Sequence, residues 1–148
     1  MNSDFRDMLS ALSDESAEFL VVGAYALAAH GIPRSTGDID LWIRPSPENA
    51  KRVWLALKRF RAPLRDLAVE DLTTADIVFQ IGIAPRRIDI LTSITGVAFE
   101  EAWEDRMQVE IDGVPLAVLS RDHLLQNKRA TGRPKDMADV AWLEAQRE

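Results

Sequence analysis

Two aspartates alternate with apolar residues in the segment 37–43, whose sequence is Gly-Asp-Ile-Asp-Leu-Trp-Ile. Successive side chains of an extended strand point to opposite faces, so Asp38 and Asp40 fall on one face and the apolar residues at 39, 41 and 43 fall on the other. The segment therefore predicts a strand with one buried face and one face that carries two carboxylates. Carboxylates on one rigid face can bridge two divalent cations, so the pattern also predicts a two-metal site.

Two further segments suit the same chemistry. Asp89 lies between Ile88 and Ile90 in a second predicted strand, where it would complete the ligand set of one ion. Upstream, a buried strand is expected to turn into a helix at Gly23 and Ala24. A helix N-terminus presents unpaired backbone N–H groups and a partial positive charge, which suit a triphosphate, and glycine lets phosphates approach the backbone. We therefore expect phosphate to bind at this turn.

The composition limits the class of protein. A chain of 148 residues with 47% hydrophobic content suits one domain, so we expect residues 1–148 to form a single unit. The absence of cysteine excludes disulfides and thiol chemistry. The first residues do not resemble a signal peptide, and the longest nearly apolar run, Phe19 to Ala29, is shorter than the roughly 20 residues that cross a bilayer. These features predict a cytoplasmic protein with no membrane association.

Charge is unevenly distributed along the chain. The net charge of -6 argues against a general nucleic-acid binder, whose affinity comes from a basic surface. The segment from Lys51 to Arg65 nevertheless holds basic residues and no acidic one, whereas the segment from Glu100 to Asp112 is almost entirely acidic in its charged residues. Such runs are typical of solvated helix or loop surfaces. The alternative is that the basic segment docks a polyanionic acceptor.

Apolar spacing and turn signals predict an alternation of helices and strands. Ser46 and Ser120 are expected to cap helices, and Asp112-Gly113 is expected to form a hairpin turn. The expected order is helix 4–12, strand 19–22, helix 23–30, strand 38–43, helix 47–60, strands 77–81 and 87–91 joined by a turn, short helix 99–103, strands 109–111 and 115–118, a helix to about 129, and a last helix containing Met137, Val140, Ala141 and Leu143.

The motifs together resemble the nucleotidyltransferase superfamily that shares the polymerase-beta-like palm fold. Its signature is an apolar residue followed by Gly-Gly or Gly-Ser, then a helix, an apolar-flanked Asp-x-Asp and a later single Asp. The matching pieces here are Val22-Gly23-Ala24, Asp38-Ile39-Asp40 and Ile88-Asp89-Ile90. The resemblance covers roughly residues 17–145 and implies an α+β fold, with a small mixed or antiparallel sheet, helices packed on one side, and C-terminal helices.

A narrower resemblance is carried by the segments 26–30, 33–37 and 128–136, which look like small stand-alone members related to the AbiEii-type toxin nucleotidyltransferases. The family implies Asp38 and Asp40 as ligands of both metals and Asp89 as a ligand of the catalytic metal. It also implies a contact from Lys128 to the triphosphate. The chain departs from the family at Ala24, which stands where a second Gly or a Ser is usual, so a hydroxyl contact to phosphate is missing.

The resemblance implies a metal-dependent nucleotidyltransferase, which uses Mg²⁺ or Mn²⁺ to move a nucleoside monophosphate from an NTP to an acceptor and releases pyrophosphate. The alternative is a catalytically silent partner protein of the same fold in a toxin–antitoxin or defence module. Arg34 and Thr36 either contact phosphate or base, or Arg34 pairs with Asp38 or Asp40 in the metal-free protein. The acceptor is left open among a tRNA, a partner protein and a small molecule, and a cognate antitoxin or a second copy is an expected partner.

Overall fold

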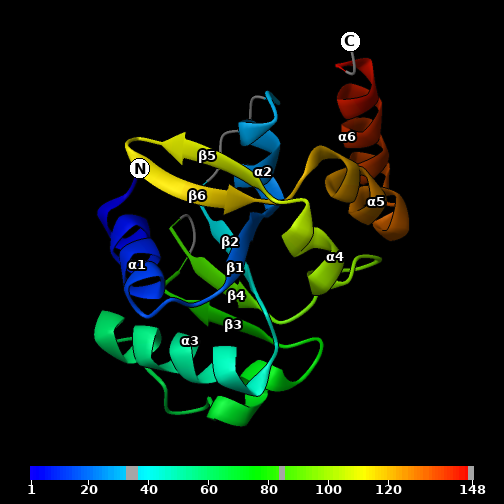
Figure 1. The fold of residues 1–148 in the computed structure, drawn as a ribbon. Coiled ribbons are helices and arrows are strands. Elements are labelled where there is room, and N and C mark those ends of the chain that lie inside the picture. The colour runs from blue at the N-terminus through cyan, green and yellow to red at the C-terminus, as the bar shows by residue number, and fades with distance from the viewer. Residues whose placement is uncertain (33–36, 84–85, 147–148) are drawn as a thin grey trace.

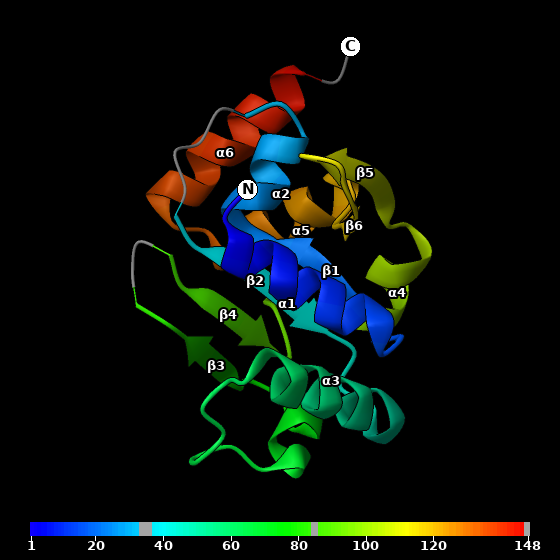
Figure 2. The same ribbon diagram turned by 90° about the vertical axis from the view of Figure 1, so that its left-hand side faces the viewer.

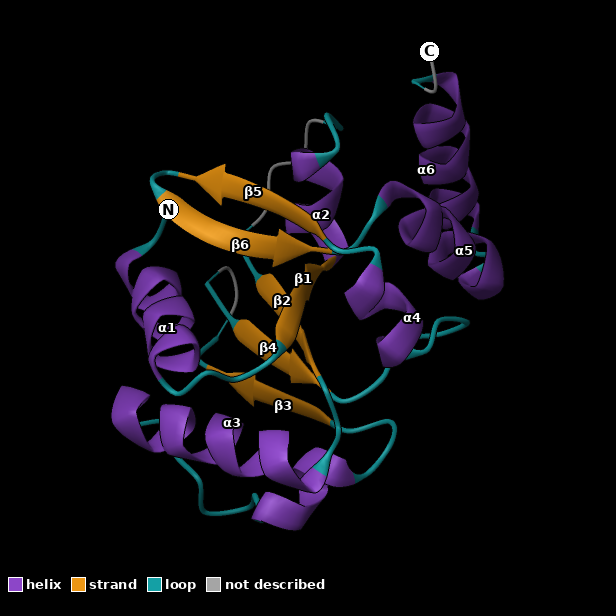
Figure 3. Cartoon of the chain, in the orientation of Figure 1, coloured by secondary structure: helices purple, strands orange, loops and turns teal. Residues whose placement is uncertain are grey.

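The computed structural model describes residues 1–32, 37–83 and 86–146. Its centre is one mixed six-stranded sheet with the order β3-β4-β2-β1-β6-β5 (Figure 3). The pairs β1–β2, β3–β4 and β5–β6 are antiparallel, and β1–β6 and β2–β4 are parallel. The strands are β1 (Phe19–Val22), β2 (Ile39–Ile43), β3 (Val78–Ile81), β4 (Ile88–Leu91), β5 (Met107–Ile111) and β6 (Val114–Val118).

The helices lie close to the expected ranges. They are α1 (Ser3–Asp14), α2 (Gly23–Ala29), α3 (Pro47–Phe60), α4 (Phe99–Glu104), α5 (Arg121–Thr131) and α6 (Pro134–Ala145), with a short 3₁₀ helix η1 (Val69–Thr73) that the sequence pattern did not predict. The side chain of Ser46 caps α3 by accepting from the Asn49 amide, and Ser120 caps α5 in the same way through His123. No helix in the described part of the chain is long and apolar enough to span a bilayer.

One face of the sheet packs against α1 and α3, which lie side by side (Figure 2). Alternation along β2 directs Ile39, Leu41 and Ile43 into this layer, where they are almost completely buried. They meet Leu9 of α1 and Val53 of α3 in one hydrophobic cluster. The α+β class with a small mixed sheet is confirmed.

The opposite face packs against the C-terminal helices (Figure 1). Trp42, which alternates away from its neighbours in β2, is buried there and meets Phe99 of α4 edge to face, with ring centroids 5.0 Å apart. Leu124 of α5 and Val140 of α6 belong to the same cluster. Asp40 and Trp42 are two residues apart on β2, so their side chains point to the same face of the sheet. Asp40 therefore lies on the face that packs against the C-terminal helices.

Candidate functional site

Asp40 and Asp89 are register partners on the adjacent parallel strands β2 and β4. Residues in register on neighbouring strands point to the same face, so the two carboxylates stand side by side. Asp38 precedes β2 instead of lying within it, and its Oδ1 accepts a hydrogen bond from the Arg87 amide at 3.0 Å. The structure thus brings together the three aspartates that the sequence singled out.

The electrostatics of Asp40 reflect this crowding. Burial, followed by the neighbouring carboxylate of Asp89 and then by Asp38, raises the pKa of Asp40 to about 6, and Arg87 opposes the rise. A carboxylate held in a partly dehydrated place beside other carboxylates is stabilised by an additional cation. The site therefore has the charge expected of a cation-binding position.

Arg87 provides a cation in this structure. Its Nε lies 2.7 Å from Oδ1 of Asp89 and its Nη2 lies 3.1 Å from Oδ2, while Nη2 is also 3.4 Å from Oδ2 of Asp38. The hydrogen bond to Asp89 is the largest of the effects that raise the pKa of Arg87. Arg87 is not among the site residues that the sequence pattern predicted. A signal was present, because a residue two positions before Asp89 on a strand lies on the same face.

The donor set suits a hard divalent cation, because Asp38, Asp40 and Asp89 offer only carboxylate oxygens. Within residues 1–32, 37–83 and 86–146, however, no group of three or more acidic, histidine or cysteine side chains is arranged to hold a metal ion. The guanidinium of Arg87 is hydrogen-bonded to Asp89 and paired with Asp38. A metal ion at this position has to displace Arg87 from at least one carboxylate, so the residues fit the metal chemically but not in their present arrangement.

Gly23 begins α2 directly after β1, with a φ of 68°. A Cβ at this position would overlap the carboxylate of Asp40, which lies against the glycine. The contact follows from the register, since Val22, the residue before Gly23, pairs with Asp40. Glycine is therefore required by the close approach of Asp40 as well as by the positive φ.

A cavity of about 320 Å³ opens beside Asp40. Five of the predicted site residues line this cavity: Gly23, Ala24, Asp38, Asp40 and Lys128. Asp89 joins the site through its pairing with Asp40, whereas Arg34 and Thr36 lie outside the described residues. The complete lining is Gly23, Ala24, Leu27, Asp38, Asp40, Lys128, Arg133, Lys135 and Asp139.

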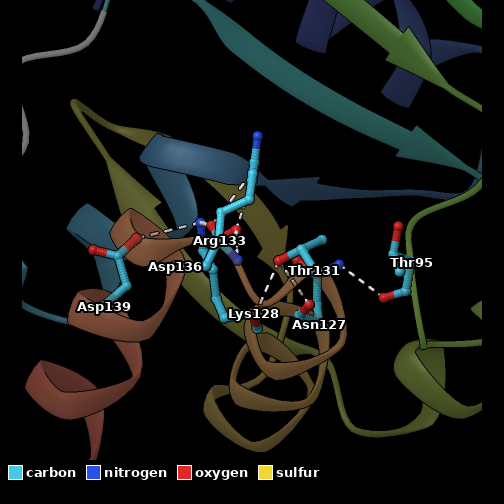
Figure 4. Close-up of polar contacts among 7 residues, drawn as sticks. All are labelled: Thr95, Asn127, Lys128, Thr131, Arg133, Asp136 and Asp139. Atoms are coloured by element: carbon cyan, nitrogen blue, oxygen red, sulfur yellow. Dashed lines mark hydrogen bonds and ion pairs between the residues drawn. The ribbon is translucent and has the colours of Figure 1, made fainter.

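Lys128 reaches the cavity from α5 but is held by two acidic residues of α6. Its Nζ is 3.3 Å from Oδ1 of Asp136 and 3.3 Å from Oδ2 of Asp139 (Figure 4). Oδ2 of Asp136 also accepts a hydrogen bond from Nε of Arg133 at 2.7 Å. This hydrogen bond is the main reason why the pKa of Asp136 lies well below its usual range. The sequence predicted a triphosphate contact for Lys128, and here its charge is already balanced by carboxylates.

Two other cations lie at the cavity. The side chain of Arg133 is 63% exposed even though it contacts Asp136, and Lys135, at the start of α6, is exposed. In the described part of the chain, no acidic side chain forms an ion pair with Lys135. Lys135 is therefore better placed than Lys128 to neutralise a bound anion without first breaking an ion pair.

Side-chain amides tie α5 to the loop that follows β4. Nδ2 of Asn127 donates to the carbonyl of Thr95 at 2.9 Å, and Nε2 of Gln126 donates to the carbonyl of Gly96 at 2.6 Å (Figure 4 shows the first). Gly96 also packs so closely on Ala130 that a Cβ there would not fit. These contacts connect the helix of Lys128 to the segment that follows the strand of Asp89.

The basic segment 51–65 lies away from this site. Most of it belongs to α3, whose buried residues Ala50, Val53 and Leu57 face the hydrophobic cluster of Leu41. Asp40 alternates onto the other face of β2. A polyanion bound to the basic segment would therefore lie on the face of the sheet opposite the carboxylates.

Comparisons with known proteins bear on the fold and the family of the chain. A crystal structure of a putative nucleotidyltransferase from Thermotoga maritima has a similar fold, with a TM-score of 0.63 and 18% sequence identity over 96% of this chain and 91% of that chain. No curated protein sequence matches the chain. Residues 3–144 match the model of a family described as nucleotidyltransferase of unknown function (DUF6036). The chain belongs to this nucleotidyltransferase family.

Proposed function

We propose that the protein transfers a nucleoside monophosphate from an NTP to an acceptor and releases pyrophosphate. The observation that carries the proposal is the single cavity at which Asp38 and Asp40 meet the cations Lys128, Arg133 and Lys135. Phosphoryl-type transfer depends mainly on positioning and on neutralising phosphate charge, and this cavity places acceptors for a metal beside donors for phosphate.

Asp38, Asp40 and Asp89 are the residues that would hold Mg²⁺ or Mn²⁺, with two ions as the family resemblance implies. The metal would neutralise the phosphates and activate the acceptor oxygen. The backbone at Gly23 and Ala24 lies at the cavity wall beside Asp40, which supports a role in phosphate binding. The absence of a hydroxyl at Ala24 leaves that role to the main chain.

The cations of the α5–α6 junction are proposed to bind the triphosphate. Lys135 carries out this role most directly, since Lys128 and Arg133 already contact Asp136. In the reaction, the acceptor oxygen bonds to the α-phosphorus while the bond from that phosphorus to the bridging oxygen breaks. Pyrophosphate leaves with that oxygen, and the acceptor proton passes to solvent.

A second candidate is a catalytically silent partner protein in a toxin–antitoxin or defence module, as the AbiEii-type resemblance suggests. Two contacts favour it: Arg87 bridges Asp38 and Asp89, and Lys128 is paired with Asp136 and Asp139. In a silent protein these contacts are permanent structural ion pairs, and partner binding survives loss of all three aspartates of the carboxylate site. In the enzyme these ion pairs are exchanged for contacts with metal and phosphate.

For the enzyme, a tRNA, a protein and a small molecule remain candidate acceptors in a cytoplasmic setting.

The test is thermal unfolding with Mg²⁺ or Mn²⁺ and each of the four NTPs. A ligand that binds the folded state raises its melting temperature, so the enzyme is expected to show a rise that needs both metal and nucleotide. Asp38→Asn/Asp40→Asn should lose the rise. The matched control, Asp7→Asn/Asp66→Asn, removes two exposed aspartates outside the cavity and should keep it. No rise with any nucleotide in the native protein would favour the silent partner.

A further inference from the structure

β3 forms one edge of the sheet and pairs only with β4 in the described residues. The amide of Thr92 donates to the carbonyl of Ile77 at 3.1 Å, which makes these two residues a hydrogen-bonded pair. Such pairs alternate along an antiparallel ladder, so Phe79 also bonds to β4, whereas the N–H and C=O groups of Val78 and Gln80 point away from it. Val78 is 54% exposed and Gln80 is exposed, so these backbone groups lie at an open edge.

The open edge adjoins the carboxylate site. Gln80 is the register partner of Asp89, and Asp89 is the register partner of Asp40. The three side chains therefore form one row across the sheet on the same face. A strand added beside β3 would continue this row, with its own residue next to Gln80.

The edge has no charged residue to protect it. Residues 77–83 include none, and Ile83 is 84% exposed. Natural edge strands are commonly blunted by charged side chains, because unpaired N–H and C=O groups recruit other strands. The basic segment 51–65, the best candidate for binding a polyanion, lies on the opposite face. The chemistry at this edge thus suits a polypeptide backbone and does not suit a nucleic acid.

We propose that the free edge of β3 binds an extended segment of a protein acceptor as an added strand, so that one of its hydroxyl side chains enters the carboxylate site. This inference rests on the proposed transferase activity and names the acceptor class. Main-chain hydrogen bonds to Val78 and Gln80 hold the segment, as in other cases of strand addition. The hydroxyl oxygen bonds to the α-phosphorus, pyrophosphate leaves with the bridging oxygen, and the hydroxyl proton passes to solvent.

The geometry limits the acceptor side chain. Neighbouring strands are about 4.8 Å apart, so the backbone of an added strand lies roughly 10 Å from that of β4. A side chain must lean across Gln80 to reach Asp89, and a long hydroxyl-bearing side chain does so more readily than serine. The side-chain amide of Gln80 lies between the added strand and Asp89, and it offers both a hydrogen-bond donor and an acceptor.

Two substitutions at one position provide the test. Val78→Pro removes the outward N–H, and an edge strand tolerates proline where that group faces solvent. Val78→Thr keeps the N–H and the β-branched shape and is the matched control. A third variant, Val78→Lys, keeps the backbone and adds a charge to the edge, in case Val78→Pro does not fold. Each is incubated with Mg²⁺, the four NTPs labelled at the α-phosphate, and a library of synthetic dodecapeptides that contain tyrosine, serine or threonine among alternating apolar residues.

The native protein and Val78→Thr are expected to label peptides, and Val78→Pro or Val78→Lys to label them at least tenfold less. The melting-temperature rise with metal and nucleotide should be the same in all four proteins, because donor binding does not use the edge. Equal labelling by edge variants and control would overturn the proposal, as would label transferred to added tRNA but to no peptide. A dimer that Val78→Pro dissociates, without peptide labelling, would make a second copy the occupant and also overturn it. Absence of any nucleotide-dependent rise would instead reject the transferase activity itself.

Discussion

Arg87 donates two hydrogen bonds to the carboxylate of Asp89, from Nε at 2.7 Å and from Nη2 at 3.1 Å. Asp89 is 6% exposed, and a cation held against its carboxylate offsets part of the cost of burying that charge. Nη2 extends the contact to Asp38 at 3.4 Å. Arg87 therefore occupies, in electrostatic terms, part of the position proposed for a metal ion.

Replacement of Arg87 should make the metal-free protein less stable and the metal-bound state easier to form. In Arg87→Gln we expect a lower free energy of unfolding in EDTA than in the native protein, because the buried carboxylate of Asp89 loses its charged partner. The affinity for Mn²⁺ should rise about tenfold, since the ion no longer competes with the guanidinium. Urea unfolding and calorimetry measure the two effects.

Arg86→Gln is the matched control, because Arg86 is an exposed neighbour with the same charge. It should change both quantities little. Equal Mn²⁺ affinity in Arg87→Gln, Arg86→Gln and the native protein would show that Arg87 does not compete with metal at this site.

Gly23→Ala tests the contact between Gly23 and Asp40. Gly23 has a φ of 68°, and its Cβ position is filled by the Asp40 carboxylate. Gly113 has a φ of 81° with no atom within 4 Å of the Cβ position, so Gly113→Ala measures the conformational cost alone. We expect Gly23→Ala to lose about 1 to 3 kcal/mol more unfolding free energy than Gly113→Ala, owing to steric overlap.

The overlap can be isolated with a double-mutant cycle in urea unfolding. Asp40→Ala removes the carboxylate, so Gly23→Ala should cost less in the Asp40→Ala background than in the native protein. Additive effects of the two substitutions would mean that the carboxylate does not set the requirement for glycine.

Local signals predicted the elements that carry the site. Alternation placed Asp40 and Asp89 opposite the buried face, and Ser46 and Ser120 marked the starts of two helices correctly, because caps and strand periodicity depend on adjacent residues. The position of Asp38 just before β2 differs by one residue from the expected strand. Strand boundaries depend on pairing with distant segments, which periodicity does not contain.

The last helix shows what the sequence could not reveal. Of its expected apolar residues, Val140 is buried but Met137 is 46% exposed, and Asp136 and Asp139 occupy buried positions instead. Aspartate is buried when charged partners compensate its desolvation, and Lys128 on the preceding helix is one of them. The orientation of α6 therefore depends on a tertiary ion pair, which hydrophobic periodicity alone does not predict.

The pKa of Asp40 leads to a pH-dependent stability. Burial and the nearby carboxylates raise it to about 6, above the value near 4 of an aspartate in an unfolded chain. A raised folded-state pKa contributes stability that is present below pH 4 and is lost as the pH rises through 6. In the metal-free protein, ionisation of Asp40 should thus cost up to about 3 kcal/mol by pH 7.5.

Asp40→Asn removes this cost. In EDTA, its unfolding free energy relative to the native protein should increase between pH 4.5 and pH 7.5, as measured by urea unfolding. Asp7→Asn, at an exposed position on α1, should show no such trend. A constant difference for Asp40→Asn at both pH values would contradict the raised pKa.

Lysines at the cavity should separate into a structural one and a ligand-binding one. Lys128 is 12% exposed and pairs with Asp136 and Asp139, which are almost completely buried. Lys128→Met leaves those carboxylates with less compensation, so we expect a loss of about 3 kcal/mol in the free energy of unfolding. Lys135→Met removes an exposed charge and should change stability by less than about 0.5 kcal/mol.

The affinity for NTP should depend on Lys135, whose replacement is expected to leave the stability almost unchanged. If Lys135 neutralises the triphosphate, Lys135→Met weakens NTP binding about threefold to tenfold at unchanged stability, and added salt weakens native binding more than it weakens the variant. Lys51→Met, which removes an exposed lysine of α3 on the opposite face, controls for net charge and should bind NTP as the native protein does. Calorimetric titration at two salt concentrations measures the effect. The opposite result would be unchanged NTP affinity in Lys135→Met and weaker NTP binding in a folded Lys128→Met. It would mean that Lys128 contacts the triphosphate and that its ion pairs open when the nucleotide binds.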